Sequence, residues 1–144
     1  MHILMRMICL LALSYMLLLS VPPPWNEEWS MEDAFERLSD FLACPKSIAI
    51  KVLQNENMCG FVFGKILQWN GSTSYDLEEI CVSSDLQKKG VGKKLMGRLE
   101  EVLVEKGVSK IHLITQRDSV PSSFYSSLGF SAIQNLVIMG KNID

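Results

Sequence analysis

A strand pattern, a glycine loop, a helix pattern and a second strand pattern follow one another in the middle of the chain. The first strand pattern covers residues 75–82, and the loop reads Gln-Lys-Lys-Gly-Val-Gly over residues 87–92. Apolar residues then recur at helical spacing over residues 91–106, and residues 110–115 form the second strand pattern. Because a crossover through a helix returns the chain in the same direction, we expect the two strands to be parallel neighbours in one sheet.

The residues before this crossover predict an antiparallel meander. Polar turn signals at residues 55–57 and 70–71 separate three stretches of strand composition. The expected elements in chain order are a helix over 31–42, strands over 47–53, 58–67 and 75–82, a helix over 91–106, a strand over 110–115, a helix over 122–128 and a strand over 136–141. We therefore expect an α/β chain of the α+β type, with a mixed, mainly antiparallel central sheet, one parallel β-α-β crossover and helices on both faces.

The length and composition are those of one globular domain. A chain of 144 residues with 48% apolar residues and a net charge of -2 supports one core and gives no indication of disorder or of a general nucleic-acid surface. The four cysteines form no Cys-x-x-Cys pair and have no histidine beside them, so we expect reduced thiols and no metal site. We assign residues 22–144 to a single domain and residues 1–21 to an apolar N-terminal segment.

Residues 7–21 are almost all apolar and follow a single basic residue, Arg6. This order is typical of the charged and apolar regions of a signal peptide, and the stretch is short for a membrane span. It runs into three prolines without a small-x-small cleavage site, so we expect a first helix in preference to an exported or anchored chain. The expected location is the cytoplasm.

Two glycines at a strand-to-helix turn suit the binding of an anion. Gly90 and Gly92 let backbone N–H groups approach a phosphate, and the start of the following helix favours negative charge. Lysines on both sides of the glycines add positive charge, with a solvated surface as the ordinary alternative. A Walker loop needs a Gly-Lys-Ser/Thr ending, and a dinucleotide fold needs a third glycine where Leu95 stands, so neither class fits.

Three blocks in this order resemble the GNAT superfamily of N-acetyltransferases: residues 77–82 (LEEICV), 87–92 (QKKGVG) and 124–130 (FYSSLGF). The resemblance covers about residues 25–141, and the preceding Pro-Pro-Trp-Asn-Glu-Glu-Trp is similar to bacterial aminoglycoside-type members. It implies the GNAT fold and an acyltransferase. It further implies acetyl-CoA as cosubstrate, no metal, and transfer of the acetyl group to a primary amine.

The resemblance also assigns the contacts to the cosubstrate. The backbone amides from Lys88 to Gly92 are expected to hold the CoA pyrophosphate, and Gln87 stands where the family has Gln or Arg. Main-chain groups of Ile80 and Val82 match the positions that meet the pantetheine arm, and the Val82 N–H is the expected donor to the thioester oxygen. The cofactor residues assigned in this way are Ile80, Cys81, Val82, Gln87, Lys88, Lys89, Gly90, Val91, Gly92 and Lys93.

Proton transfer is assigned to two side chains. Tyr125 matches the family's tyrosine that returns a proton to the leaving thiolate, with a packing role as the alternative. Glu79 is either the base that takes a proton from the acceptor amine or a ligand of its cation, and the sequence leaves both roles open. Strict alternation along the strand places Glu79 on one face with Leu77 and Cys81, and Glu78 on the other.

The acceptor is expected to be a small cationic amine. The residues assigned to its binding are Trp25, Glu28, Trp29 and Glu78. The first three lie in an acidic and aromatic segment where the family has its mobile acceptor site, and a capped surface helix with core tryptophans is the alternative. We expect acetyl-CoA and an amine as partners, without nucleic acid or membrane, and leave a homodimer open.

Two departures from the family pattern leave other functions open. We expect the first strand to be shortened or lost before the apolar segment, and residues 116–119 (QRDS) replace an asparagine that many members carry before the tyrosine. The alternatives are a CoA-binding domain without activity, an exported or membrane-anchored interaction module, and an enzyme that acetylates a protein N-terminus or lysine.

Overall fold

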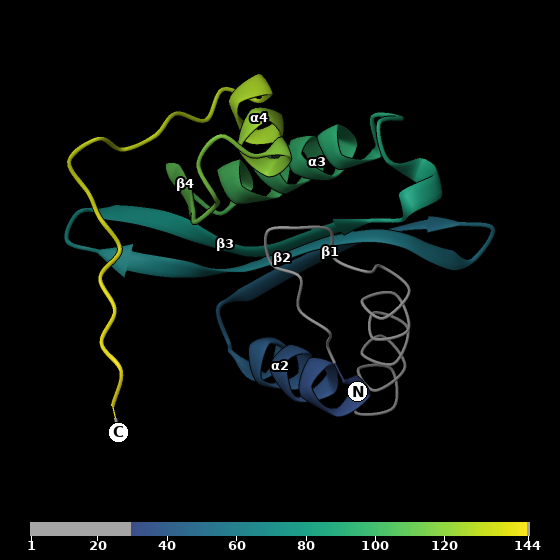
Figure 1. Cartoon of the computed structure of the whole chain (residues 1–144), viewed down its shortest axis with the longest axis horizontal. Helices are drawn as coiled ribbons and strands as arrows, with labels where there is room; N and C mark the ends of the chain where they lie inside the picture. The colour runs from purple at the N-terminus through teal and green to yellow at the C-terminus, as the bar shows by residue number, and fades with distance from the viewer. Residues whose placement is uncertain (1–29, 144) are drawn as a thin grey trace. The chain divides into compact units, whose positions relative to one another are not determined.

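The computed structural model describes residues 30–143, whose helices and strands are shown in Figure 1. The elements in chain order are α2 (Met31–Ala43), β1 (Ser47–Gln54), β2 (Asn57–Trp69), β3 (Ser72–Val82), the short 3-10 helix η1 (Ser84–Leu86), α3 (Val91–Glu105), β4 (Lys110–Leu113) and α4 (Val120–Ser127). The described residues up to Ile114 form one compact unit and those from Thr115 a second, and each is described by itself. The apolar segment 1–21 lies outside the described residues.

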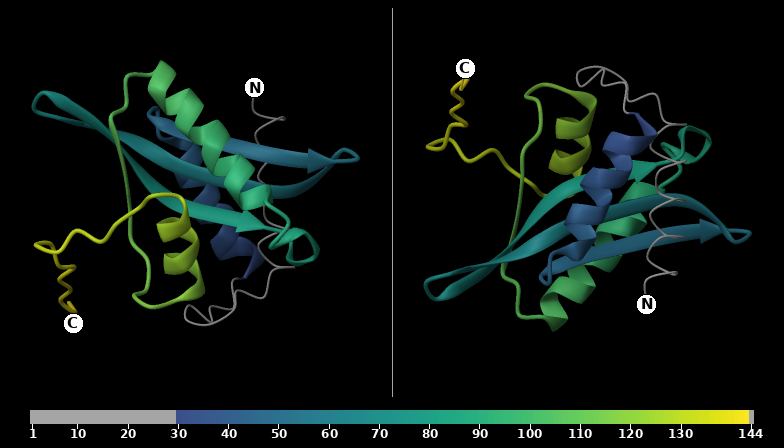
Figure 2. Two further views of the ribbon diagram at one scale, coloured as in Figure 1. Left: turned by 90° about the horizontal axis from the view of Figure 1, so that it is seen from above. Right: turned by 90° about the horizontal axis from the view of Figure 1, so that it is seen from below.

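The first unit is built on a four-stranded mixed sheet with the strand order β1-β2-β3-β4. The pairs β1–β2 and β2–β3 are antiparallel, and the pair β3–β4 is parallel. Helix α3, which connects the two parallel strands, crosses one face of the sheet, and α2 covers the opposite face, as Figures 1 and 2 show. The predicted meander, the parallel crossover and the helices on both faces are thus confirmed.

The turn between β1 and β2 has the backbone that a tight hairpin requires. Asn55 and Glu56 have φ angles of 49° and 66°. Two consecutive left-handed residues form a type I′ turn, whose twist matches that of the flanking strands. The turn therefore fixes the register in which Gln54 faces Asn57.

Aromatic and aliphatic side chains hold α2 against the sheet. Ser30 begins the helix by accepting a hydrogen bond from the Asp33 amide at 3.0 Å. Leu38 is then buried in one cluster with Phe61 and Phe63 of β2. Full burial of a side chain of this size contributes about 1.5–3 kcal/mol, so this cluster is a main attachment of the helix.

Glycines on β2 allow close packing on the opposite face. A Cβ on Gly60 would lie 3.3 Å from the Leu95 side chain of α3, and a Cβ on Gly64 would lie 2.5 Å from the Tyr75 ring. Leu95 and Tyr75 are fully buried, and the Tyr75 hydroxyl donates to the Ile48 carbonyl at 2.9 Å. The even-numbered residues of β2 from Gly60 to Gly64 therefore lie on the α3 face of the sheet.

The second unit contains α4 and the C-terminal segment. Ser119 begins α4 in a reciprocal capping box with Ser122. Residues 136–141, which we predicted as a final strand, form no strand with any described residue, so that prediction is wrong. Their apolar and β-branched composition favours a strand, but a strand also needs a neighbour that satisfies its main-chain hydrogen bonds.

The described cysteines, Cys44, Cys59 and Cys81, are free thiols. Within residues 30–143, no three histidine, cysteine, aspartate or glutamate side chains are grouped so as to hold a metal ion. None of the described helices combines the length and the apolar character that crossing a bilayer demands.

Candidate active site

A β-bulge in β3 places two neighbouring carboxylates on one face of the sheet. Phe63 of β2 pairs with Glu79, while the next residue, Gly64, pairs with Leu77, so Glu78 is the extra residue. A bulge interrupts the alternation of a strand at that point. The side chains of Glu78 and Glu79 consequently both reach the same arginine of α2.

This arrangement corrects the prediction made from strict alternation. Leu77 pairs with a glycine on the α3 face, whereas Cys81 packs with the cluster on the α2 face. Glu79 shares the α2 face with Cys81, as predicted. Leu77, which was expected on that face, lies on the α3 face. Glu78, which was expected on the opposite face from Glu79, lies on the α2 face with it. The single extra residue at the bulge is the physical reason, because it shifts the side-chain alternation by one position.

Arg37 and Lys65 lie against these two carboxylates. The Nη2 atom of Arg37 is 3.9 Å from Glu78 Oε2 and 3.7 Å from Glu79 Oε2. The Nζ atom of Lys65 is 3.4 Å from Glu78 Oε1. These side chains are 32–39% exposed, and an ion pair with that much exposure contributes only about 0–1 kcal/mol. The charges can therefore exchange partners at low cost.

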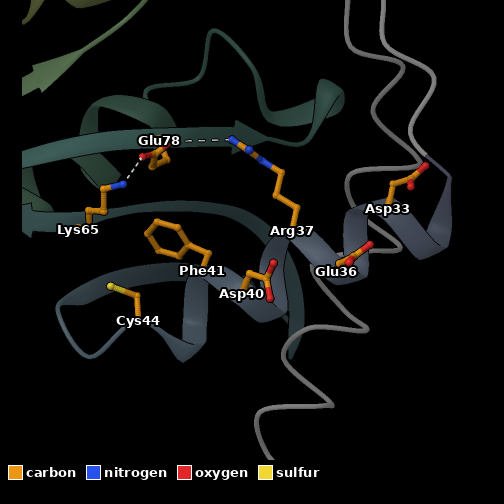
Figure 3. Close-up of a pocket in the computed structure, with 8 residues that line it drawn as sticks. All are labelled: Asp33, Glu36, Arg37, Asp40, Phe41, Cys44, Lys65 and Glu78. Atoms are coloured by element: carbon orange, nitrogen blue, oxygen red, sulfur yellow. Dashed lines mark ion pairs between the residues drawn. The ribbon is translucent and has the colours of Figure 1, made fainter. Parts of the chain in front are cut away.

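An open pocket of about 570 Å³ lies beside this charged group (Figure 3). Its lining residues are Asp33, Glu36, Arg37, Asp40, Phe41, Cys44, Lys65 and Glu78. Figure 3 shows the Arg37 side chain extending from α2 to Glu78 on β3, which Lys65 approaches from β2. The lining contains four carboxylates and two cations, so its net charge is negative and favours a cationic ligand.

A hydrogen bond connects the loop after β3 to the end of that strand. The side-chain amide of Gln87 donates to the Val82 carbonyl at 3.1 Å. Lys88 and Gly90 have left-handed backbones, with φ of 60° and 81°. Residues 87–90 are exposed, so this fixed loop is accessible to a ligand.

The start of α3 differs from that of the other two α-helices described. A serine side chain accepts from the third-residue amide in α2 and α4. In α3 the cap residue is Gly90, which has no side chain to accept such a bond, and the first turn contains no acidic residue. The amides of Val91, Gly92 and Lys93 thus begin a 15-residue helix whose dipole favours negative charge. Exposed lysines at 88, 89 and 93 add positive charge, and such an end suits a phosphate.

β3 extends beyond its parallel partner. Its pairing with β4 ends at Leu77, whereas β3 continues to Val82. The Ser83 amide donates to the Cys59 carbonyl on β2 at 3.0 Å, and antiparallel partners alternate between bonded and non-bonded pairs. The main-chain groups of Val82 and Ile80 therefore point away from β2, toward the edge that β4 leaves open. Among the described strands, none pairs with this edge of β3 beyond Leu77.

Two titratable groups near this strand end have shifted pKa values. Burial, with a smaller contribution from the nearby Glu79 carboxylate, raises the pKa of the Cys81 thiol to about 12. The thiol is therefore protonated and unreactive at neutral pH. A hydrogen bond from the Ser83 side chain lowers the pKa of Asp85, and Lys89 acts in the same direction.

Tyr125 lies on α4 in the second unit. Its side chain is buried, and its ring centroid is 5.3 Å from that of Phe124 and 5.6 Å from that of Phe130, both in edge-on geometry. These contacts orient the ring within its own unit, and its role as an acid stays a prediction. Trp25, Glu28 and Trp29 lie outside the described residues, so their assignment to the acceptor also stays a prediction.

Several pocket residues, among them Glu36, Arg37 and Asp40, were missed by the reasoning from sequence. Asp33, Glu36, Arg37 and Asp40 recur at intervals of three and four residues and so form one charged stripe on the predicted helix. That spacing could have marked the stripe as a unit. Its contact with Lys65 and with the bulge depends on packing between distant segments, for which the sequence contains no local signal.

Most of the chain is similar to known proteins in sequence pattern and in fold. The profile of the Acetyltransferase (GNAT) family matches residues 14–130. The fold is similar to that of an aminoglycoside acetyltransferase from an uncultured soil metagenomic sample, solved with sisomicin, at 19% identity and a TM-score of 0.72 over 96% of this chain and 89% of that chain. It is also similar to ribosomal-protein-alanine N-acetyltransferase from Brucella melitensis, at 19% identity and a TM-score of 0.69 over 95% and 93% of the two chains. A third similar structure is aminoglycoside N-acetyltransferase AAC(6')-Iy in complex with CoA, at 18% identity and a TM-score of 0.71 over 92% and 89%.

Proposed function

The chain belongs to the GNAT family of acetyltransferases, and we propose that it transfers the acetyl group of acetyl-CoA to a small cationic amine. The observation that carries this proposal is the junction of β3 and α3. An exposed helix start with no side-chain cap adjoins an open strand edge, so one extended ligand could meet both. Acetyl-CoA has a diphosphate that could bind at the helix start and an amide-containing arm that could pair with the strand edge.

In this proposal the cosubstrate is held mainly by the protein backbone. The amides of residues 88–92 bind the diphosphate, and Lys88, Lys89 and Lys93 strengthen the attraction. The pantetheine arm pairs with main-chain groups of Ile80 and Val82 along the open edge. The Val82 carbonyl already accepts from Gln87, which leaves the Val82 N–H as the group that stabilises the oxygen of the thioester during attack.

The acceptor is proposed to bind on the α2 face, in the pocket beside the bulge. The net negative lining supports a cationic amine, and the bulge directs the Glu79 carboxylate to this face. The metagenomic aminoglycoside acetyltransferase was solved in complex with sisomicin, which is consistent with amines as a class of acceptor in the family. The acceptor of the present chain is proposed from the charge of its own pocket.

The proposed reaction requires two proton transfers. The ammonium of the acceptor first gives up a proton, which passes through Glu79 to solvent, because only the neutral amine can attack. The nitrogen then forms a C–N bond to the carbonyl carbon as the C–S bond breaks. Tyr125 donates a proton to the departing sulfur, and the second proton lost by the nitrogen returns to the tyrosine.

The test is an assay of thiol release from acetyl-CoA with a panel of amines that includes spermidine, sisomicin and a peptide with an N-terminal alanine. We expect release with a cationic small amine, and we expect Glu79→Gln to lower kcat/KM by about 10²-fold or more if it acts as the base. Glu105→Gln, the same change at an exposed position of α3, is the matched control. Release with the peptide alone would contradict the proposed acceptor, and acetyl-CoA binding without release across the panel would contradict the proposed activity.

A further inference from the structure

We propose that Arg37 determines which amines the protein accepts, because its guanidinium occupies the position that the acceptor's ammonium group must take. This inference rests on the proposed function, since it concerns the acceptor side of the same site. It follows from the contacts of one nitrogen atom, from the pocket around it and from the charges spaced along α2.

The Arg37 Nη2 atom lies near both carboxylates of the bulge. It is 3.9 Å from Glu78 Oε2 and 3.7 Å from Glu79 Oε2. Both separations exceed those of N–H···O hydrogen bonds, so the contacts of this atom with Glu78 and Glu79 are electrostatic. A primary ammonium is smaller than a guanidinium and has three donors, which suits it to a position between two carboxylates.

Displacement of this arginine has a low cost. Its side chain is 39% exposed, and each of its ion pairs with Glu78 and Glu79 changes an equilibrium by at most about fivefold at that exposure. Asp33 precedes Arg37 by four residues and Asp40 follows it by three, so both lie within reach on the same helix. Both also line the pocket, as Figure 3 shows. The guanidinium thus has carboxylates to move to when an ammonium takes its place.

The exchange selects acceptors by charge. An amine that arrives as a cation replaces one positive charge by another between Glu78 and Glu79, so neither carboxylate is left uncompensated. A neutral amine leaves Arg37 in place and is kept away from Glu79. An acceptor with a carboxylate beside its amine meets the net negative lining of the pocket and is repelled.

The test is calorimetric titration of spermidine into the full chain without acetyl-CoA. We expect Arg37→Gln to bind spermidine about three- to tenfold more tightly than the wild type, because the competing cation is gone. Lys106→Gln removes the same charge at the exposed end of α3 and should leave the affinity unchanged. Equal or weaker binding by Arg37→Gln, or no spermidine binding by either protein, would overturn the proposal.

A second measurement on the unaltered protein is independent of whether the glutamine variant folds. The Nε–Hε resonance of Arg37, identified by its absence in Arg37→Lys, should shift as spermidine is added. An unchanged resonance while spermidine binds would show that the arginine does not move and would refute the exchange. Because neither experiment contains acetyl-CoA, a failure of acetyl transfer would contradict the proposed function and leave these two results standing.

Discussion

Replacement of Gly90 by alanine isolates the contribution of the loop backbone. Gly90 caps α3 with φ 81° and ψ 3°, and a Cβ added there would meet no atom within 4 Å. The cost of Gly90→Ala is therefore conformational, about 1–2 kcal/mol for an L-residue in the left-handed region. If the loop relaxes to avoid this cost, the amides of the first turn lose their common direction.

Gly97 provides a matched comparison in the same helix. It lies inside α3 and is exposed, and an added Cβ would again meet no atom within 4 Å. Alanine is favoured over glycine inside a helix by about 0.5–1 kcal/mol. The same chemical change should therefore destabilise the protein at position 90 and stabilise it at position 97, with a difference of about 2 kcal/mol between the two variants.

Urea unfolding and calorimetry measure the two consequences. With a denaturant slope of about 1–3 kcal/mol per molar, the unfolding midpoints of the two variants should differ by about 1 M. We expect acetyl-CoA to bind Gly90→Ala at least about tenfold more weakly than the wild type, since backbone bonds to charged groups are lost, and to bind Gly97→Ala normally. Midpoint shifts in the same direction, or full affinity in Gly90→Ala, would refute this account of the loop.

Three further predictions concern the rest of the chain. Tyr125→Phe should lower kcat by about 10²-fold with acetyl-CoA affinity unchanged in calorimetry, and an unaltered kcat would leave Tyr125 with a packing role. Gly64→Ala should cost about 3 kcal/mol or more in thermal unfolding, because its Cβ would lie 2.1 Å from the Asp76 carbonyl oxygen, and a near-native Tm would contradict that packing. The free energy of unfolding should fall as the pH rises from about 9 toward 12, since the unfolded chain ionises the Cys81 thiol before the folded chain does. Cys81→Ala should flatten part of this decline in urea titrations, and an identical pH profile would exclude the contribution.

The order of elements could be predicted from the sequence because it depends on local patterns. The turn at Asn55 and Glu56 and the cap at Ser30 are encoded by residues that are close together in the chain. The loop at residues 87–92 was likewise visible as two glycines at a change from strand to helix. These features follow from backbone preferences, which need no knowledge of distant neighbours.

The candidate site could be predicted only in part, because its geometry depends on pairing between segments. The bulge at Glu78 exists only in the register of β3 against β2, and nothing in residues 77–82 alone marks the extra residue. Strict alternation therefore assigned Glu78 to the wrong face. The contact of Arg37 with both carboxylates follows from the same bulge and from the packing of α2. Strand propensity at residues 136–141 failed for a related reason, since propensity does not supply a pairing partner.

The most direct measurement is calorimetric titration of the full chain with acetyl-CoA and, separately, with pantetheine. Pantetheine has the arm that would follow the open edge of β3 but lacks the diphosphate. If the start of α3 holds the diphosphate, acetyl-CoA should bind at one site per chain, and pantetheine at least about 10²-fold more weakly. Equal affinity for the two, or no heat of binding with acetyl-CoA, would contradict the account.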